Sequence, residues 1–327
     1  MRIVINGFGR IGRTVLRQIL ALPEKEDIAI VRINDIAPLE TCTYLFKYDS
    51  VYGPYPGHVE AGAQSLTIDG QEILFSAEPD LSVLDLSDVD VVLECTGKAN
   101  MEEIARRGLS AGARNVLISG PSPAADRTLV LGANEEELGS HRLISNGSCT
   151  TNALAPLLRG LDDAIGIQSG HMTTIHCYTG SQPMVDAPRG PLERSRAGGV
   201  SMVPTTTSAT KLVGKVLPQI EGRITGAAVR VPTISVSAVD LTVTWKRPVA
   251  GSVNDLLQDI FSNSSVIGFT GDHVVSTDMR ARPESLVIAL PETLTTGDRQ
   301  ARIFGWYDNE WGFSRRMIDM ARLMAAR

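Results

Sequence analysis

The stretch INGFGRIGR, residues 5 to 13, decides the fold expected for the first half of this 327-residue chain. It carries a G-x-G-x-x-G pattern, which by itself is a weak signal. Here the pattern follows a short apolar run, Met1 to Ile5, and precedes Thr14 to Leu22, where apolar residues recur at helical spacing. A second apolar run extends from Ile28 to Asn34. This order predicts a strand, a glycine turn, a helix and a strand, the βαβ unit of dinucleotide-binding proteins.

Each position of the glycine pattern has a physical role in binding a dinucleotide. Gly7 would make the tight turn, Gly9 would let a pyrophosphate approach the backbone, and Gly12 would let the helix pack closely on the sheet. The helix N-terminus would supply amide donors and a positive dipole. Asp35, directly after the second strand, can accept hydrogen bonds from both ribose hydroxyls and would repel a 2′-phosphate. NAD is therefore expected in preference to NADP; the alternative is a structural turn followed by a solvated aspartate.

Strand and helix patterns continue to alternate through the first 148 residues. Strands are expected at Val91 to Glu94 and at Asn115 to Ile118, with a helix at Asn100 to Leu109 between them. This alternation predicts an α/β fold with a Rossmann-type, doubly wound parallel sheet. We assign residues 1–148 to an NAD-binding domain.

The pattern changes after Cys149. Four leucines between residues 154 and 161 mark one face of a helix, and Pro156 is expected to fall early in that helix or to bend it. Long alternating runs follow at His171 to Tyr178 and at Ile234 to Trp245. They predict an α+β catalytic domain, residues 149–312, with a largely antiparallel sheet covered on one side.

Two further segments of this half can be interpreted from their composition and from the spacing of their apolar residues. Residues 180–205 are rich in Gly, Pro, Ser and Arg, which predicts a long ordered loop. Residues 313–327 carry apolar side chains at helical spacing and are expected to form a helix that returns to the NAD-binding domain.

Composition excludes several classes of partner. The formal charge of −6 argues against nucleic acid, and there is no run of about 18 apolar residues that would indicate a membrane span. The four cysteines show no CxxC pair and no zinc spacing, so we expect no metal and a reducing compartment. No signal peptide is apparent, and a cytoplasmic protein is expected.

Cys149 lies in the stretch SNGSCTTNA, among small hydroxyl residues and just ahead of the predicted helix. At a helix N-terminus the dipole would stabilise a thiolate, and residues 150–152 are of the kind that cap such an end. His176, at the end of a predicted strand, is the best candidate for the base, although a structural histidine is an equal alternative. With a nicotinamide, this set suits the oxidation of an aldehyde through a hemithioacetal and a thioester. Water or phosphate could then release the product.

At this point the chain closely resembles the phosphorylating glyceraldehyde-3-phosphate dehydrogenase family over nearly its whole length. The resemblance rests on eight segments in matching order: INGFGRIGR, ISGPS, SNGSCTTNALAP, TTIHCYT, ERSRAGG, MVPTTTSATK, AVRVPTISVSAVDLT and WYDNEWGFS. It implies a homotetramer that uses NAD, inorganic phosphate and a phosphorylated aldehyde.

The resemblance also implies roles for particular residues. Cys149 matches the nucleophile and His176 the base. The cofactor-binding positions are Gly7, Gly9, Arg10, Ile11, Gly12, Asp35, Ser119 and Asn309. The positions for the substrate phosphate are Thr179, Ser181 and Arg230, and those for inorganic phosphate are Ser148, Thr150, Arg194, Thr207 and Ser208.

Some positions depart from the family, and other functions compete. Cys177 stands where alanine is common, Ala153 where a second cysteine is frequent, and Phe313 where tyrosine is frequent. Phe313 leans toward erythrose-4-phosphate dehydrogenase, a sister enzyme with the same chemistry, whereas Asp35 leans toward the triose phosphate, which we favour. A cofactor-binding protein without catalysis and a dehydrogenase of the aspartate-semialdehyde type are further alternatives.

Overall fold

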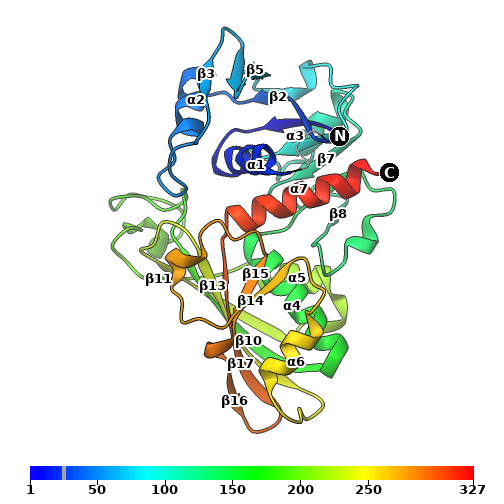
Figure 1. Cartoon of the computed structure of the whole chain (residues 1–327), viewed down its shortest axis with the longest axis vertical. Coiled ribbons are helices and arrows are strands. Elements are labelled where there is room, and N and C mark those ends of the chain that lie inside the picture. The colour runs from blue at the N-terminus through cyan, green and yellow to red at the C-terminus, as the bar shows by residue number, and fades with distance from the viewer. Residues whose placement is uncertain (24–26) are drawn as a thin grey trace. The chain divides into compact units, whose positions relative to one another are not determined.

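The computed structural model describes residues 1–23 and 27–327, and these form two compact units. Unit 1 consists of Met1–Leu129, Glu136–Gly147 and Ser314–Arg327, and unit 2 of Val130–Glu135 and Ser148–Phe313. Each unit is built on a single sheet, whose strands can be followed by label in Figure 1.

The sheet of unit 1 is mostly parallel, as the glycine stretch predicts, with antiparallel pairs at β3–β4 and β4–β5. Its strands run in the order β3-β4-β5-β2-β1-β6-β7-β9-β8, and β1 pairs in parallel with β2 on one side and β6 on the other. The chain therefore changes direction across the sheet beside β1, which is where doubly wound sheets bind ligands. The strands are β1 (Arg2–Asn6), β2 (Ala29–Asn34), β3 (Val59–Ala61), β4 (Ser65–Ile68), β5 (Gln71–Ser76), β6 (Val91–Glu94), β7 (Asn115–Ile118), β8 (Arg127–Thr128) and β9 (Leu143–Ser145).

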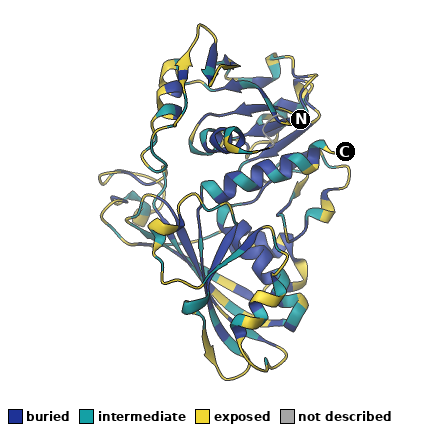
Figure 2. Cartoon of the chain, viewed as in Figure 1, coloured by how far each residue is buried: buried dark blue, intermediate teal, exposed yellow. Residues whose placement is uncertain are grey.

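Helices pack closely on this sheet. The helices are α1 (Arg10–Ala21), α2 (Leu39–Lys47), α3 (Glu102–Ser110) and, from Ser314 onward, α7 (Trp311–Ala325). Gly108 of α3 lies so close to Val92 and Val116 that a Cβ there would approach the Val116 side chain to 2.8 Å. The predicted apolar stripe of the terminal helix is fully buried, as the dark blue of α7 in Figure 2 shows. Asn115 at the start of β7 donates a hydrogen bond to the carbonyl of Met324 (3.3 Å), which ties α7 to unit 1.

The sheet of unit 2 is largely antiparallel, as predicted, and is mixed because it also contains parallel pairs. Its order is β11-β12-β10-β13-β17-β15-β14, with β16 on β17, and two pairs, β10–β12 and β14–β15, are parallel. A parallel pair needs a long crossover, and residues 178–223 between β10 and β12 provide one. The strands are β10 (Ile167–Cys177), β11 (Val203–Thr205), β12 (Ile224–Val231), β13 (Ser237–Trp245), β14 (Ile267–Thr270), β15 (Leu286–Ala289), β16 (Leu294–Thr296) and β17 (Gln300–Tyr307).

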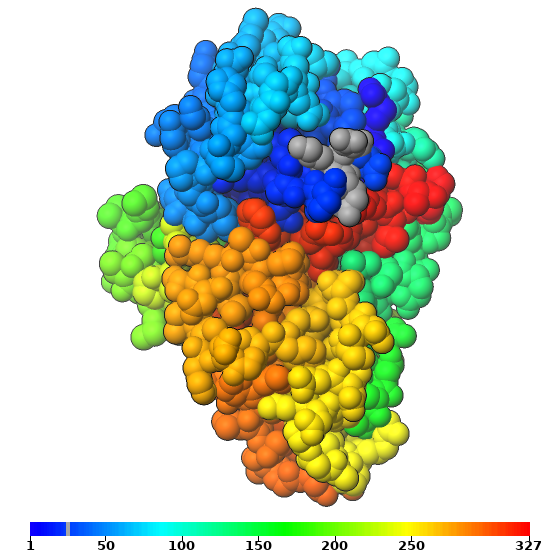
Figure 3. Space-filling view, in the orientation of Figure 1, coloured from blue at the N-terminus to red at the C-terminus, as the bar shows by residue number. Residues whose placement is uncertain are grey.

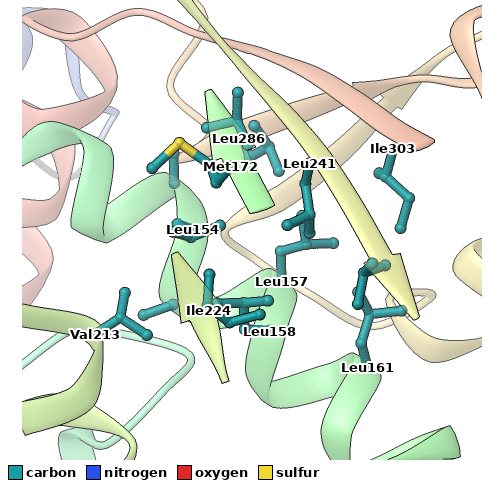
Figure 4. Close-up of a cluster of buried hydrophobic side chains, with 14 of the residues drawn as sticks. Leu154, Leu157, Leu158, Leu161, Met172, Val213, Ile224, Leu241, Leu286 and Ile303 are labelled. Atoms are coloured by element: carbon teal, nitrogen blue, oxygen red, sulfur yellow. The ribbon is translucent and has the colours of Figure 1, made fainter. Parts of the chain in front are cut away.

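Three helices cover this sheet: α4 (Cys149–Ile165), α5 (Ala209–Val216) and α6 (Val253–Ile260). The leucine face of α4 meets the apolar face of β10, β13 and β17 in one buried cluster, which Figure 4 shows in close-up. Pro156 lies in the middle of α4 and not early in it. It is buried, and the tertiary packing of α4 offsets the lost backbone hydrogen bond. The described helices include none that is both long enough and apolar enough to cross a bilayer.

The segment predicted as a long loop contains two short elements, a 3-10 turn at Leu192–Ser195 and strand β11. It lies on the surface, light green in Figure 3, and exposes several large apolar side chains, among them Met184, Leu192 and Val200.

Candidate functional site

The three glycines of the turn in unit 1 serve two purposes. Two of them are packed against backbone atoms of the protein, and the third faces open space. Gly7 has φ +93°, and a Cβ on it would lie 2.6 Å from the carbonyl carbon of Cys95. A Cβ on Gly12 would collide with the carbonyl oxygen of Gly7. At Gly9 no atom lies within 4 Å of the position of a Cβ. The backbone at Gly9, the N-cap of α1, is thus open to a bound phosphate group.

A pocket of about 390 Å³ lies beside this turn. The two carboxylate oxygens of Asp35 are held by backbone amides, with Phe8 N–H donating to Oδ2 (2.6 Å) and Ala37 N–H to Oδ1 (2.9 Å). This fixes the carboxylate at the pocket while leaving lone pairs on both oxygens for a ribose. The lining residues are Asn6, Gly7, Gly9, Asn34, Asp35, Ile36, Glu78, Pro79, Leu81, Cys95, Thr96, Lys98, Ile104 and Arg107.

Three of the predicted cofactor residues of unit 1 line this pocket and the others lie around it. Arg10 and Ile11 form the first turn of α1, where helix geometry leaves the amides without an intrahelical acceptor. The guanidinium of Arg10 is paired with Asp49 and lies over the ring of Tyr52, so its backbone is the part suited to a pyrophosphate. Ser119 follows β7, and its amide donates to the carbonyl of Glu94 (2.9 Å).

A buried polar chain beside the pocket was missed from the sequence. Asn34 donates to the side-chain oxygen of Asn6 (2.8 Å), and Asn6 donates in turn to the carboxylate of Glu94. Thr96 also donates to Glu94 through its amide (3.0 Å) and its hydroxyl. Burial raises the pKa of Glu94, and the hydrogen bonds from Thr96 and Asn6 oppose that rise. Their position in the sequence could have revealed these residues. Asn6, Asn34 and Glu94 are each the last residue of a parallel strand, and ligands bind at that end of such sheets.

In unit 2, Cys149 is the first residue of α4, where the sequence placed it. The cap of this helix is Ser148, whose hydroxyl oxygen accepts from the amide of Thr151 (3.1 Å), and not a residue of the 150–152 stretch. Cys149 Sγ lies 3.6 Å from Nε2 of His176, the penultimate residue of β10. Residues 27 positions apart in the chain thus form a thiol–imidazole pair.

The contacts of His176 decide which ring nitrogen faces the sulfur as a base. Nδ1 lies 2.7 Å from the carbonyl oxygen of Cys177 and 3.0 Å from Nη1 of Arg230. Because the shorter contact is to a group that can only accept, we assign the proton to Nδ1, which donates it to that carbonyl. Nε2 is then the nitrogen with a free lone pair, directed at Cys149. Arg230, which pairs with His176 across β12 and β10, donates to the same carbonyl (3.0 Å). Burial, followed by the charge of Arg230, lowers the pKa of His176 to about 4.

The surroundings of Cys149 also favour the protonated, neutral form of its thiol. Burial raises its pKa, while hydrogen bonding with Thr150 and the charge of Arg230 act in the opposite direction. With the pKa of His176 lowered, the described residues favour a neutral thiol beside a neutral imidazole. This loss of solvation opposes the thiolate that was expected at the helix N-terminus.

Tyr307 is a second residue that sequence reasoning missed. Its hydroxyl, fully buried at the end of β17, bonds to the hydroxyls of Thr150 (2.9 Å) and Thr174 (2.8 Å). Its ring meets the imidazole of His176 edge-on at 6.0 Å between centroids. Thr150, predicted for inorganic phosphate, therefore has its hydroxyl turned toward Tyr307 in the interior.

Four more of the predicted anion-binding residues lie on β12 or between β10 and β11. Thr179 and Ser181 hydrogen-bond to each other through their hydroxyls (2.9 Å). Arg194 donates to the hydroxyl of Thr205 on β11 (2.9 Å), and β11 pairs with β12 so that Val203 lies opposite Arg230. Burial lowers the pKa of Arg230, and the positive charge of Arg194 adds to this.

Three predicted residues lie at helix or strand ends. Thr207 accepts from the amide of Ala209 (3.1 Å), and Ser208 is the N-cap of α5. Asn309 follows β17, and its side-chain oxygen accepts from Cys177 and Ser237.

The arrangement in unit 2 suits attack by a thiol on a carbonyl carbon, because a base lies at the sulfur and a guanidinium is held beside that base. In the part of the chain that the structure describes, no three His, Cys, Asp or Glu side chains gather as a metal site. The pocket of unit 1 has the features of a dinucleotide site, namely a glycine turn at a helix N-terminus and an aspartate at the end of the next strand.

Comparisons with known proteins give one family for both units. Residues 1–102 match the family model described as glyceraldehyde 3-phosphate dehydrogenase, NAD binding domain, and residues 148–309 match that for the C-terminal domain. The chain is 45% identical over 330 residues to glyceraldehyde-3-phosphate dehydrogenase of Pseudomonas aeruginosa, covering all of this chain and 98% of that protein. It is 43% identical over 332 residues to the enzyme of Xanthobacter flavus, covering 99% and 98% of the two chains. It is 41% identical over 334 residues to glyceraldehyde-3-phosphate dehydrogenase 2 of Bacillus subtilis, covering 100% and 97%.

Proposed function

The chain belongs to the glyceraldehyde-3-phosphate dehydrogenase family, NAD-dependent oxidoreductases, and from this premise we propose that it oxidises glyceraldehyde 3-phosphate to 1,3-bisphosphoglycerate. The single observation that carries the proposal is the pair formed by Cys149 Sγ and His176 Nε2 at 3.6 Å. The hydrogen bond from Nδ1 to Cys177 supports it, because this bond holds the imidazole in the tautomer that accepts a proton from sulfur.

In the proposed reaction, His176 Nε2 accepts the thiol proton as Cys149 Sγ bonds to the aldehyde carbon. The proton returns to the oxygen, which gives a hemithioacetal. His176 then accepts the hydroxyl proton as a hydride leaves the carbon and a thioester forms. NAD⁺, when bound, supplies the acceptor for that hydride. Inorganic phosphate attacks the thioester, and His176 returns its proton to the departing sulfur of Cys149.

The anion-binding residues are proposed to work in two groups. Thr179, Ser181 and Arg230 would bind the phosphate of the substrate, since a guanidinium beside two linked hydroxyls suits a dianion. For inorganic phosphate we propose Ser148, Thr150, Arg194, Thr207 and Ser208. The buried contact of Thr150 with Tyr307 makes Thr150 the weakest member of this group.

For the cofactor we propose the glycine turn, Arg10, Ile11, Asp35 and Ser119 in unit 1 and Asn309 in unit 2. Residues 1–148 would then form the NAD-binding domain, 149–312 the catalytic domain and 313–327 the returning helix. We further propose a cytoplasmic homotetramer. The four free cysteines support a reducing compartment, and the exposed apolar side chains of residues 184–202 support a subunit contact.

The substrate can be tested by initial rates with glyceraldehyde 3-phosphate and erythrose 4-phosphate, each with and without inorganic phosphate and with NAD or NADP. We expect the triose phosphate to give the higher kcat/KM, a strong requirement for phosphate, and a preference for NAD because Asp35 would repel a 2′-phosphate. A higher kcat/KM for the tetrose phosphate with weak dependence on phosphate would assign the chain to the alternative, erythrose-4-phosphate dehydrogenase. Phe313, 5% exposed, is the feature that favours this alternative.

Replacing Arg230 by leucine should raise the KM for the aldehyde by about 10- to 100-fold, since a hydrogen bond to a charged group contributes roughly 1.5–3 kcal/mol. The KM for NAD should change little. Arg299→Leu is a matched control, because Arg299 is an exposed arginine of the same unit that donates to the carbonyl of Lys246 (3.0 Å). An unchanged aldehyde KM in the Arg230 variant would place the substrate phosphate elsewhere.

A further inference from the structure

Three buried side chains of unit 2, two at strand ends and one just after a strand, meet next to His176. Cys177 is the last residue of β10, Ser237 the first of β13, and Asn309 follows β17. Cys177 Sγ and Ser237 Oγ each lie 3.2 Å from the side-chain oxygen of Asn309. Cys177 and Ser237 are 1% exposed and Asn309 is 8% exposed, so little solvent competes for these contacts.

The direction of each hydrogen bond follows from its neighbours. The amide of Cys177 donates to Ser237 Oγ (3.2 Å), which leaves the hydroxyl proton of Ser237 to be donated to Asn309. Burial raises the pKa of the Cys177 thiol to about 12, so at neutral pH the sulfur carries a proton and is also a donor. Asn309 Oδ1 therefore accepts from two groups.

Two donors on one oxygen determine which way the amide of Asn309 is turned. A flip by 180° would direct the NH₂ group at two donors and would lose both hydrogen bonds. In the orientation held here, no described residue accepts from Nδ2, so both of its N–H groups are left for a ligand.

The backbone next to Ser237 is also held in an unusual conformation. Val236 has φ +65°, a region that β-branched residues rarely occupy, and its side chain is 2% exposed. Such strain persists only where the surrounding packing enforces it, so the backbone that carries Ser237 is held by that packing.

We propose that Cys177 and Ser237 are positioning residues that hold the Asn309 amide in the orientation needed to donate to the carboxamide oxygen of NAD. This rests on the proposed function, in which Asn309 binds that end of the cofactor. Alanine, common at position 177 in the family, could not donate, so the thiol gives this chain a second donor on Asn309. The binding of the substrate aldehyde is not expected to depend on the orientation of the Asn309 amide.

The test compares the affinities of the variants Cys177→Ala, Cys177→Ser and Ser237→Ala for NAD and for ADP-ribose, measured by calorimetry. ADP-ribose lacks the nicotinamide and reports only the remaining contacts. We expect NAD to bind about 3- to 10-fold more weakly to the two alanine variants, and ADP-ribose to bind them as it binds the wild type. Cys177→Ser keeps a donor and should restore the affinity for NAD. Cys42→Ala, at a buried thiol in α2 of unit 1, is the matched control.

A second readout uses deuteride transfer from a 1-deuterated aldehyde. A nicotinamide held by its carboxamide accepts hydride on one face, so the wild type should form one C4-deuterated NADH diastereomer, whereas Cys177→Ala and Ser237→Ala should form a measurable fraction of the other. Equal loss of affinity for NAD and ADP-ribose, or unchanged NAD affinity and a single diastereomer in both alanine variants, would overturn the proposal. If the wild type binds NAD but oxidises neither aldehyde, the proposed function fails while the calorimetric comparison still decides the role of Cys177 and Ser237.

Discussion

Replacing Cys149 by serine should lower the dehydrogenase kcat by about 10⁴-fold or more, on the scale seen when a catalytic nucleophile is removed. A serine hydroxyl at the start of α4 would be a far weaker nucleophile than the sulfur, which lies 3.6 Å from its base. The binding of NAD should be unaffected, because Cys149 is not among the residues that line the pocket of unit 1. Stopped-flow absorbance at 340 nm under single-turnover conditions measures the rate of hydride transfer. Mass spectrometry of the protein after mixing with aldehyde and NAD measures the acyl group on the enzyme.

The control for Cys149 is Cys42→Ser, a substitution of a buried thiol in the other unit, which should leave the turnover unchanged. The wild type should gain the mass of the acyl group when phosphate is absent and lose it when phosphate is added. A Cys149→Ser enzyme that keeps more than a few per cent of the turnover, or an acyl group found on another residue, would show that the nucleophile is misassigned.

Replacing His176 by asparagine should lower kcat/KM by about 10²- to 10⁴-fold, the usual contribution of a general base. The reaction of the variant would depend on the small fraction of Cys149 that ionises without help. Since burial raises the pKa of this thiol, that fraction should increase about tenfold per pH unit between pH 7 and 9. The wild type should show a flatter profile over the same range, because His176, with its pKa lowered to about 4, is neutral throughout.

The matched control for His176 is His171→Asn on the same strand, an exposed histidine that contacts the hydroxyl of Thr225 (2.9 Å). It should retain the wild-type rate and pH profile. A His176 variant whose profile is as flat as that of the wild type, or whose rate falls less than tenfold, would contradict the role of this imidazole as the base.

His176 also links stability to pH, and the sign can be worked out. Its pKa in the folded protein lies near 4, below the 6.5 of an unperturbed histidine, so the unfolded chain binds more protons between these values. Folding free energy from this residue is therefore fully present above about pH 6.5 and is lost as the pH falls toward 4. His176→Asn should be the less acid-sensitive protein in thermal melts over that window.

The sequence by itself determined the parts of this protein that depend on short-range pattern. The glycine spacing, the apolar runs and the closing acid at Asp35 predicted β1, α1 and β2 within a few residues of their bounds. The alternating run from Ile234 to Trp245 predicted a strand, and in β13 every second residue from Val239 to Trp245 is buried. Cys149 could be placed at the start of a helix because the helical spacing of apolar residues depends only on residues close to one another in the sequence.

Only the tertiary structure decided what depends on distant residues and on burial. The parallel pairing of β10 with β12, which sets Arg230 beside His176, joins segments 54 positions apart in sequence. Tyr307 hydrogen-bonds to Thr150, 157 positions away in the sequence, and no local sequence pattern predicts such a contact. The directions in which the pKa values of Cys149 and His176 shift also depend on the tertiary structure, because the free energy of a charge depends on the solvent that the fold excludes from it.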